Sequence, residues 1–171
     1  MRTLILLRHA KSSWDRLDLD DIDRPLAPRG RKAARAVARH MKKEELLPDL
    51  VLCSPAVRVR ETFELICEEL GQEVPARILR TLYLGAPSRL LASVARAPDE
   101  IAQLMLIGHN PGLGSLAVRL AGSGPAKALR QMEEKFPTAA LAVIVFDADR
   151  WSALEPGSGR LKAFVRPKDL A

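Results

Sequence analysis

The sequence predicts an α/β fold built on a mostly parallel sheet. Short apolar segments alternate along the chain with longer segments of helical periodicity. The first apolar segment, residues 3–7, shows no alternation with polar residues, which is typical of a strand buried on both faces. Apolar residues make up 47% of the chain and charged residues 28%, which excludes disordered, collagen-like and coiled-coil classes. We expect a single domain over residues 1–171.

Each element follows from its apolar spacing and from the residues at its ends. Residues 28–43 place small apolar side chains on one face and arginine and lysine on the other, as in an amphipathic helix. Ser54 and Asn110 each precede a proline, and a capping residue followed by proline predicts a helix start. Gly71 and Gly122 predict the ends of these two helices. The other predicted elements are a helix at 88–97, strands at 50–53, 103–107, 141–146 and 161–165, and an ambiguous segment at 77–84 that is either loop or edge strand.

The chain lacks the features of a secreted or membrane protein. No apolar run approaches the ~20 residues that a membrane span needs. The N-terminus has neither the apolar stretch nor the cleavage site of a signal peptide. The two cysteines, Cys53 and Cys67, are too few for a disulfide framework. We therefore expect a soluble, cytoplasmic protein that makes no membrane contact.

The basic net charge has two possible meanings. With 27 Lys+Arg against 21 Asp+Glu, the charge is +6, which raises the question of nucleic-acid binding. Aromatic residues make up only 4% of the chain, whereas a single-strand binder needs rings on which bases stack. Most of the basic residues are arginine, and the guanidinium group matches phosphate oxygens. We expect phosphate recognition and no nucleic-acid partner.

Polar residues suited to phosphate follow three of the predicted strands. Arg8 and His9 follow the first strand, and Ser54 follows the second, with Arg58 one turn into the next helix. His109 follows the third strand. Because loops beyond the carboxyl ends of parallel strands build the ligand site of an open α/β sheet, we expect these side chains to converge. Two arginines, two histidines and two helix N-termini would form a positive pocket for a phosphoryl group.

Histidine chemistry fits such a pocket without a metal ion. A neutral imidazole is available at pH 7 and can attack phosphorus as a nucleophile. Phosphoryl transfer otherwise needs positioning and charge neutralisation, which the arginines supply. The acidic segment with Asp18, Asp20 and Asp23 lacks the glycine and the distant glutamate of a calcium loop. We predict no metal and no cofactor, and we interpret the third histidine, His40, as solvated.

Three spaced blocks of sequence resemble the histidine phosphatase (phosphoglycerate-mutase-like) superfamily. Residues 7–14 resemble its opening Arg-His-Gly signature, residues 54–62 its second block, and residues 108–111 its third block. The acidic loop, together with Arg24-Pro25-Leu26 and Arg29-Gly30, resembles the compact phosphohistidine phosphatase (SixA-type) branch. The resemblance covers nearly the whole chain in order. It implies a three-layer α/β/α sandwich of the phosphoglycerate-mutase-like fold.

The resemblance also implies roles for individual residues. His9 would be the nucleophile that becomes transiently phosphorylated. Arg8, Arg58 and His109 would bind the phosphoryl group, and Ser12 and Arg24 would add substrate contacts. Two positions depart from the family pattern, because Ala10 replaces the signature glycine and Ala27 replaces a capping hydroxyl. The alanine at position 10 is tolerable if its φ is negative, and Pro28 partly offsets the lost cap.

The general acid is the larger departure. Many superfamily members carry a glutamate after the second helix, whereas residues 81–88 of this chain contain no carboxylate. An alkoxide is a poor leaving group without a proton donor. Either Asp21, with Asp23 as the second choice, supplies the proton, or the substrate needs less help. A phosphorylated imidazole is such a substrate, since its P–N bond breaks readily once the ring is protonated.

These observations predict a metal-independent phosphatase that works through a phospho-His9 intermediate. The expected substrate is a phosphorylated protein, for example a histidine phosphotransfer domain, because 171 residues leave no room for a lid over a small substrate. The basic helix at 29–43 is a candidate docking face for such a partner. Alternatives are a phosphatase of a small phosphorylated metabolite and a phosphate-binding module without catalysis. We expect a monomer.

Overall fold

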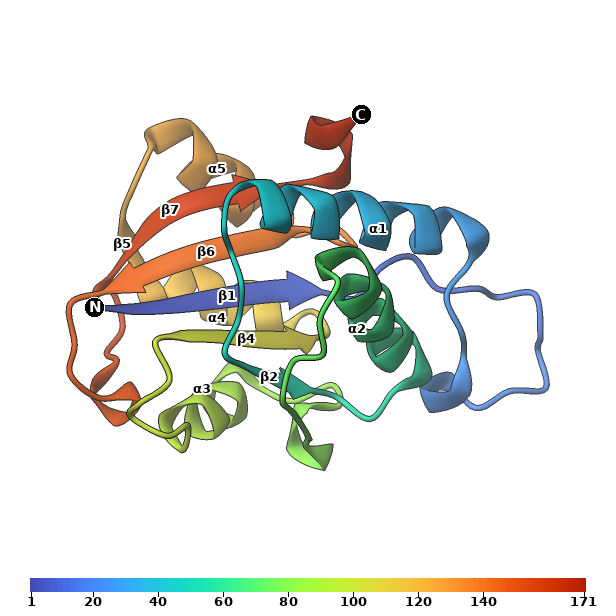
Figure 1. Cartoon of the computed structure of the whole chain (residues 1–171), viewed down its shortest axis with the longest axis horizontal. Coiled ribbons are helices and arrows are strands. Elements are labelled where there is room, and N and C mark those ends of the chain that lie inside the picture. The colour runs from blue at the N-terminus through green and yellow to red at the C-terminus, as the bar shows by residue number, and fades with distance from the viewer.

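The computed structural model describes residues 1–171 and contains one seven-stranded sheet with the order β3-β2-β4-β1-β6-β7-β5 (Figure 1). The strands β3, β2, β4 and β1 run parallel to one another, and β5 runs parallel to β7, whereas β6 runs antiparallel to both β1 and β7. This arrangement confirms the mostly parallel sheet. The strands are β1 (Arg2–Arg8), β2 (Leu50–Cys53), β3 (Ala76–Ile78), β4 (Gln103–Gly108), β5 (Ala121–Ser123), β6 (Leu141–Phe146) and β7 (Gly159–Val165).

Helices cover both faces of the sheet, which confirms the three-layer sandwich (Figure 1). Side chains alternate along β1, so Leu4 and Leu6 enter the core on one face and Ile5 and Leu7 enter the core on the other. Helices α3, α4 and α5 share the core that contains Leu4 and Leu6, and α1 and α2 share the core that contains Ile5 and Leu7. The helices are α1 (Pro28–Lys43), α2 (Val57–Leu70), α3 (Pro87–Ala95), α4 (Gly112–Leu120) and α5 (Ala126–Glu134). None of them has the length and hydropathy to cross a membrane.

The N-terminus of α1 is tied to the loop that follows β1. Ala27 caps this helix without a side-chain hydrogen bond, and Pro28 occupies its first turn. A Cβ atom at Gly30 would lie 2.0 Å from the carbonyl oxygen of Lys11, so only glycine permits this close approach. Ala10 is fully buried and has a negative φ, which explains why it tolerates a methyl group at this position.

Two sequence-based expectations about helix starts need correction. Helix α2 begins at Val57 with Ala56 as its N-cap, so Ser54 does not cap it. The Ser54 hydroxyl instead makes a hydrogen bond with His109, which is described below. At α4, Pro111 is the N-cap, and the Asn110 side-chain oxygen accepts a hydrogen bond from the backbone N–H of Gly114 at 3.0 Å.

Three arginines on the basic face of α1 form ion pairs with α2. Arg31 contacts Glu61, Arg35 contacts Glu68 and Glu69, and Arg39 also contacts Glu69. These exposed pairs join the two helices on one face of the sheet, although each is worth at most about 1 kcal/mol. The positive charge that made this helix a candidate docking face is therefore partly neutralised within the chain.

Candidate active site

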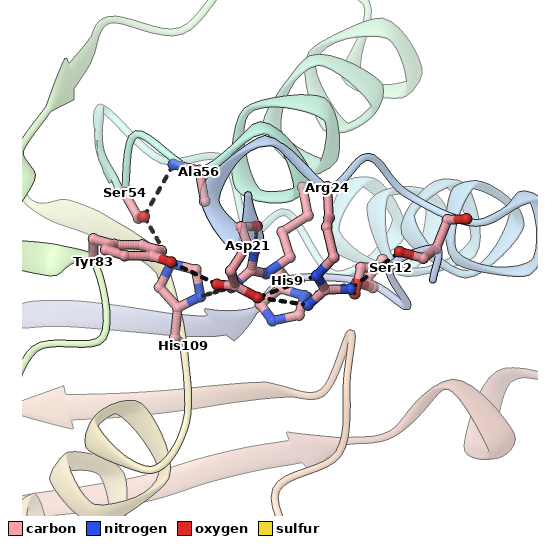
Figure 2. Close-up of polar contacts among 11 residues, drawn as sticks. His9, Ser12, Asp21, Arg24, Ser54, Ala56, Tyr83 and His109 are labelled. Carbon is pink, nitrogen blue, oxygen red and sulfur yellow. Dashed lines mark hydrogen bonds and ion pairs between the residues drawn. The ribbon is translucent and has the colours of Figure 1, made fainter. Parts of the chain in front are cut away.

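The sheet brings the carboxyl ends of three strands together at one edge. Strand β4 lies between β1 and β2, with Arg8 opposite Gly108 and Cys53 opposite Ile107 in the parallel register. His9, Ser54 and His109 come directly after these strand ends and gather at one place (Figure 2). The ring centroids of His9 and His109 are 5.3 Å apart, and the two residues are 7% and 3% exposed. The predicted convergence of the strand-end residues is thus present in the structure.

The ring of His9 is oriented by the backbone of the next residue, Ala10. Its Nδ1 atom lies 2.7 Å from the carbonyl oxygen of Ala10. A carbonyl can only accept, so Nδ1 carries the proton and donates it, which leaves Nε2 with a free lone pair. Burial lowers the pKa of His9 to about 4, and the nearby charges of Arg58 and Arg8 act in the same direction. His9 is therefore neutral at pH 7, with Nε2 available as a nucleophile.

His109 is held by contacts at both ring nitrogens. An arginine can only donate, so Nδ1 of His109 accepts from Nη2 of Arg58 at 3.3 Å. The other nitrogen, Nε2, donates to the Ser54 hydroxyl oxygen at 2.7 Å, and that oxygen also accepts from the backbone N–H of Ala56 (Figure 2). Burial, followed by the proximity of His9 and Arg58, lowers the pKa of His109 to about 3. The Ser54 contact fixes the plane of the ring.

Arg8 and Arg58 supply the positive charge of the site. Arg8 donates from Nη1 to the carbonyl oxygen of Phe136 at 3.1 Å, and burial together with Arg58 lowers its pKa. Arg58 is 3% exposed and lies in the first turn of α2. The Nε atoms of both arginines are buried without a hydrogen-bond partner. Buried donors are nearly always paired, so two unpaired donors beside two neutral histidines indicate a site arranged for an anion.

Asp21 is the carboxylate that pairs with Arg58 and Arg24. It begins a 3-10 turn (Asp21–Asp23) in the loop between β1 and α1. Its Oδ2 accepts from Nη2 of Arg58 at 3.0 Å, its main-chain oxygen accepts from Nη1 of Arg58 at 2.7 Å, and its Oδ1 lies 3.0 Å from Nη2 of Arg24. Partial burial raises the pKa of Asp21, but the donors outweigh it and hold this pKa at about 2. Asp21 is thus an ionised carboxylate at pH 7.

Arg24 and Ser12, the expected further substrate contacts, bind each other. Nη1 of Arg24 donates to the Ser12 hydroxyl at 2.6 Å and to the carbonyl oxygen of Ser13 at 3.1 Å. The guanidinium also lies 3.6 Å from the ring centroid of Trp14, an exposed side chain. With Asp21 on its remaining side, Arg24 is engaged by the chain at each of its three nitrogens. It therefore orders the loop that carries Asp21.

Sequence reasoning missed one residue of this site, Tyr83. Its hydroxyl lies 2.5 Å from Oδ2 of Asp21 and donates to it, and its ring meets the ring of His109 edge-on at a centroid distance of 5.3 Å (Figure 2). Tyr83 lies within residues 81–88, where only a carboxylate was sought. Asp23, the second choice for the general acid, is exposed and makes no side-chain hydrogen bond. A signal for Tyr83 was present, since tyrosine is the single phenol of the chain and follows the second helix.

Comparisons with known proteins place this arrangement in a family. The model of the histidine phosphatase superfamily (branch 1) matches residues 4–83. An uncharacterised protein of Mycobacterium tuberculosis is 37% identical over 164 residues, which cover 95% of this chain and 100% of the relative. Phosphohistidine phosphatase SixA of Escherichia coli is 25% identical over 170 residues, which cover 98% of this chain and 95% of SixA.

A solved structure from Nakamurella multipartitia, assigned to phosphohistidine phosphatase SixA, superposes with a TM-score of 0.82 at 27% identity, covering 97% of this chain and 96% of that one. The fold and the site define the class of the protein, an α/β/α phosphatase. The chain belongs to the histidine phosphatase superfamily and to its SixA-type branch. This outcome confirms the family and the fold expected from the three sequence blocks.

Proposed function

We propose that the phosphatase works through a phospho-His9 intermediate and that its substrate is a protein carrying phosphohistidine. One observation carries the proposal. His9 is buried, neutral and tied through Nδ1 to Ala10, so that its Nε2 lone pair is free beside the two arginines. This is the state that nucleophilic attack on phosphorus requires.

The proposed reaction has two balanced steps. In the first step, Nε2 of His9 forms a bond to phosphorus while the bond from phosphorus to the leaving nitrogen breaks, and the leaving imidazole departs neutral with a proton on its other nitrogen. In the second step, water attacks the phosphorus, the bond to His9 breaks, and inorganic phosphate leaves with the neutral ring restored. Arg8 and Arg58 neutralise charge on the phosphoryl oxygens in both steps.

The substrate class rests on the proton supply. Asp21 holds no proton at pH 7 in the free enzyme, and neither histidine is hydrogen-bonded to a carboxylate. A protonated phosphohistidine brings its own proton to the leaving group, whereas an ester needs a donor. The general-acid hypothesis for Asp21 stays a prediction, and it requires that a bound phosphoryl group raise this pKa.

The surroundings of the site also favour a protein substrate. A groove of about 600 Å³ borders Arg8 and Asn110 and continues between α4 and α5. Short loops lead from β2 and β4 to their helices, and the longer segment between β1 and α1 is the one that carries Asp21 and Arg24. The likeness to SixA of Escherichia coli, a phosphohistidine phosphatase, supports the same substrate class.

The test compares phosphate release from a phosphohistidine protein with release from p-nitrophenyl phosphate, with EDTA present throughout. His9→Ala is expected to abolish both activities, and His40→Ala, a change of the histidine on α1, is the matched control. Phosphorylated His9 is expected after rapid quenching at alkaline pH, detected by mass spectrometry. Release from the ester alone would redirect the search to small metabolites, and binding without release would favour a non-catalytic module.

A further inference from the structure

Tyr83 joins two parts of the site that come from different elements. It follows a 3-10 turn (Arg80–Leu82) at the end of the segment that leads from β3 to α3. Its hydroxyl contacts Asp21, which lies 62 residues earlier in the chain, and its ring contacts His109. Tyr83 is half-buried, and its side chain also packs against the core that α1 and α2 share with the sheet.

We propose that Tyr83 is a positioning residue, whose hydroxyl fixes the Asp21 carboxylate as a clamp on Arg58 and whose ring fixes the His109 imidazole. The proposal rests on the proposed function, since it assigns Arg58 and His109 to the phosphoryl group. Tyr83 itself touches neither the reacting nitrogen of His9 nor the phosphorus.

The clamp acts on one end of the Arg58 guanidinium. Asp21 accepts from Nη1 through its main-chain oxygen and from Nη2 through Oδ2. The second N–H of Nη2 points to His109, so Nε is the donor of this guanidinium that has no partner within the chain. An arginine held at one end presents the other edge in a fixed direction, which lowers the entropy lost when an anion binds.

Tyr83 is one of the donors that fix the carboxylate of this clamp, and it acts on Oδ2, the oxygen that contacts Arg58. Oδ2 of Asp21 has two donors, Arg58 and Tyr83, which approach it from different elements. Without the phenol, Oδ2 keeps only Arg58 and Oδ1 keeps its two donors from Arg24, so the carboxylate loses the restraint that comes from the β3–α3 segment. Burial and the neighbouring Asp21 raise the pKa of Tyr83, so the phenol remains a donor throughout the neutral range.

The edge-on packing against His109 is a separate contribution. The phenol ring lies at 90° to the imidazole, with the two ring centroids 5.3 Å apart. Edge-to-face pairs of this kind favour one relative orientation of the two rings. Tyr83→Phe keeps this packing and removes only the hydroxyl, so the two contributions can be measured apart.

A double-mutant cycle tests the proposal. Tyr83→Phe, Asp21→Asn and the double variant are compared for kcat/KM with a phosphohistidine protein and for the Kd of inorganic phosphate by calorimetry. We expect Tyr83→Phe to weaken both quantities about tenfold, as for a hydrogen bond to a charged group. In the Asp21→Asn background the same change should have less than a twofold effect, because the clamp is already lost. Thr81→Val removes a hydroxyl from the same turn and should change neither quantity.

Two further results decide between positioning and a merely structural role. Tyr83→His keeps a ring and a donor, and it should recover part of the loss seen in Tyr83→Phe. Wild-type values for Tyr83→Phe, or an equal loss in the Asp21→Asn background, would overturn the proposal. If the proposed function is wrong, the wild-type enzyme forms no phospho-His9. The Kd values for inorganic phosphate would still test the role of Tyr83 in that case.

Discussion

The Nδ1 atom of His9 lies 2.7 Å from the carbonyl oxygen of Ala10, and this contact fixes which nitrogen of the ring can react. The contact is made within two adjacent residues at the end of β1, so the strand itself presets the tautomer. Alanine at position 10 preserves it because the backbone there needs no positive φ. The departure from the glycine of the family signature therefore leaves the nucleophile intact.

Activity should stay constant well below the usual pKa of histidine. Since the pKa of His9 is about 4, the ring remains an unprotonated nucleophile down to about pH 5. The pH profile of kcat/KM reports the free enzyme, and we expect its acid limb near pH 4, with a tenfold loss per unit below it. The measurement uses p-nitrophenyl phosphate, corrected for the ionisation of the ester. An acid limb near pH 6.5 would show that His9 titrates as an exposed histidine.

The same histidines should make folding stability depend on pH. Their folded pKa values, about 4 for His9 and about 3 for His109, lie below the unfolded value of 6.5. The unfolded chain therefore binds protons first, so this stability is fully present above pH 6.5 and is lost as the pH falls toward 4. One pKa unit corresponds to about 1.4 kcal/mol, which makes the loss from His9 on the order of 3 kcal/mol.

Urea unfolding between pH 4.5 and 7.5 measures this dependence. The free energy of unfolding of wild type should rise with pH up to about 6.5 and then level off, and His9→Gln should flatten the rise. His40→Gln serves as the control, since His40 lies on α1 away from both buried rings. Equal slopes for wild type and His9→Gln would show that His9 has the same pKa in the folded and unfolded chains.

Replacement of Arg58 by lysine should be severe although charge is conserved. The guanidinium reaches Asp21 through two nitrogens and His109 through one of them, and an ammonium group cannot reproduce this planar fork. We expect kcat/KM to fall about a hundredfold, as when a buried charged donor is lost. Arg60→Lys changes an exposed arginine of the same helix and is the matched control. Comparable activity of the two variants would exclude a directional role for Arg58.

The sequence predicted the parts of the molecule that have a local signal. Strands β2 and β6 and helix α1 match their predicted bounds because their apolar spacing continues to the residue where each element ends. Helix α5 was missed because Met132 is its single buried residue, which leaves almost no apolar stripe. Strand β5 was missed because its three residues are small or polar.

The residues of the candidate site also fall into two groups, those with a local sequence signal and those without one. Arg8, His9 and His109 follow strand ends, so their convergence was accessible from the sequence. The Ser54 hydroxyl binds His109 across 55 residues, and the Tyr83 hydroxyl binds Asp21 across 62, so neither contact leaves a periodic signal. A residue type alone cannot show that Asp21 sits between two arginines, and that placement decides whether it holds a proton.

Asp21→Asn separates the two roles open to this residue. A general acid matters most when the leaving group is poor, so its loss should spare a good leaving group such as nitrophenolate. A clamp on Arg58 matters equally for every substrate, because it acts on the phosphoryl group that all of them share. With its pKa held at about 2 by Tyr83, Arg58 and Arg24 against the opposing effect of burial, Asp21 is placed to be the clamp.

We expect kcat/KM to fall by a similar factor, about tenfold to a hundredfold, for p-nitrophenyl phosphate, an alkyl phosphate and a phosphohistidine protein. Asp23→Asn, a change of the exposed neighbour, should leave all three rates unaltered. A loss confined to the alkyl phosphate would instead establish Asp21 as the proton donor, since only that leaving group departs as a strongly basic alkoxide.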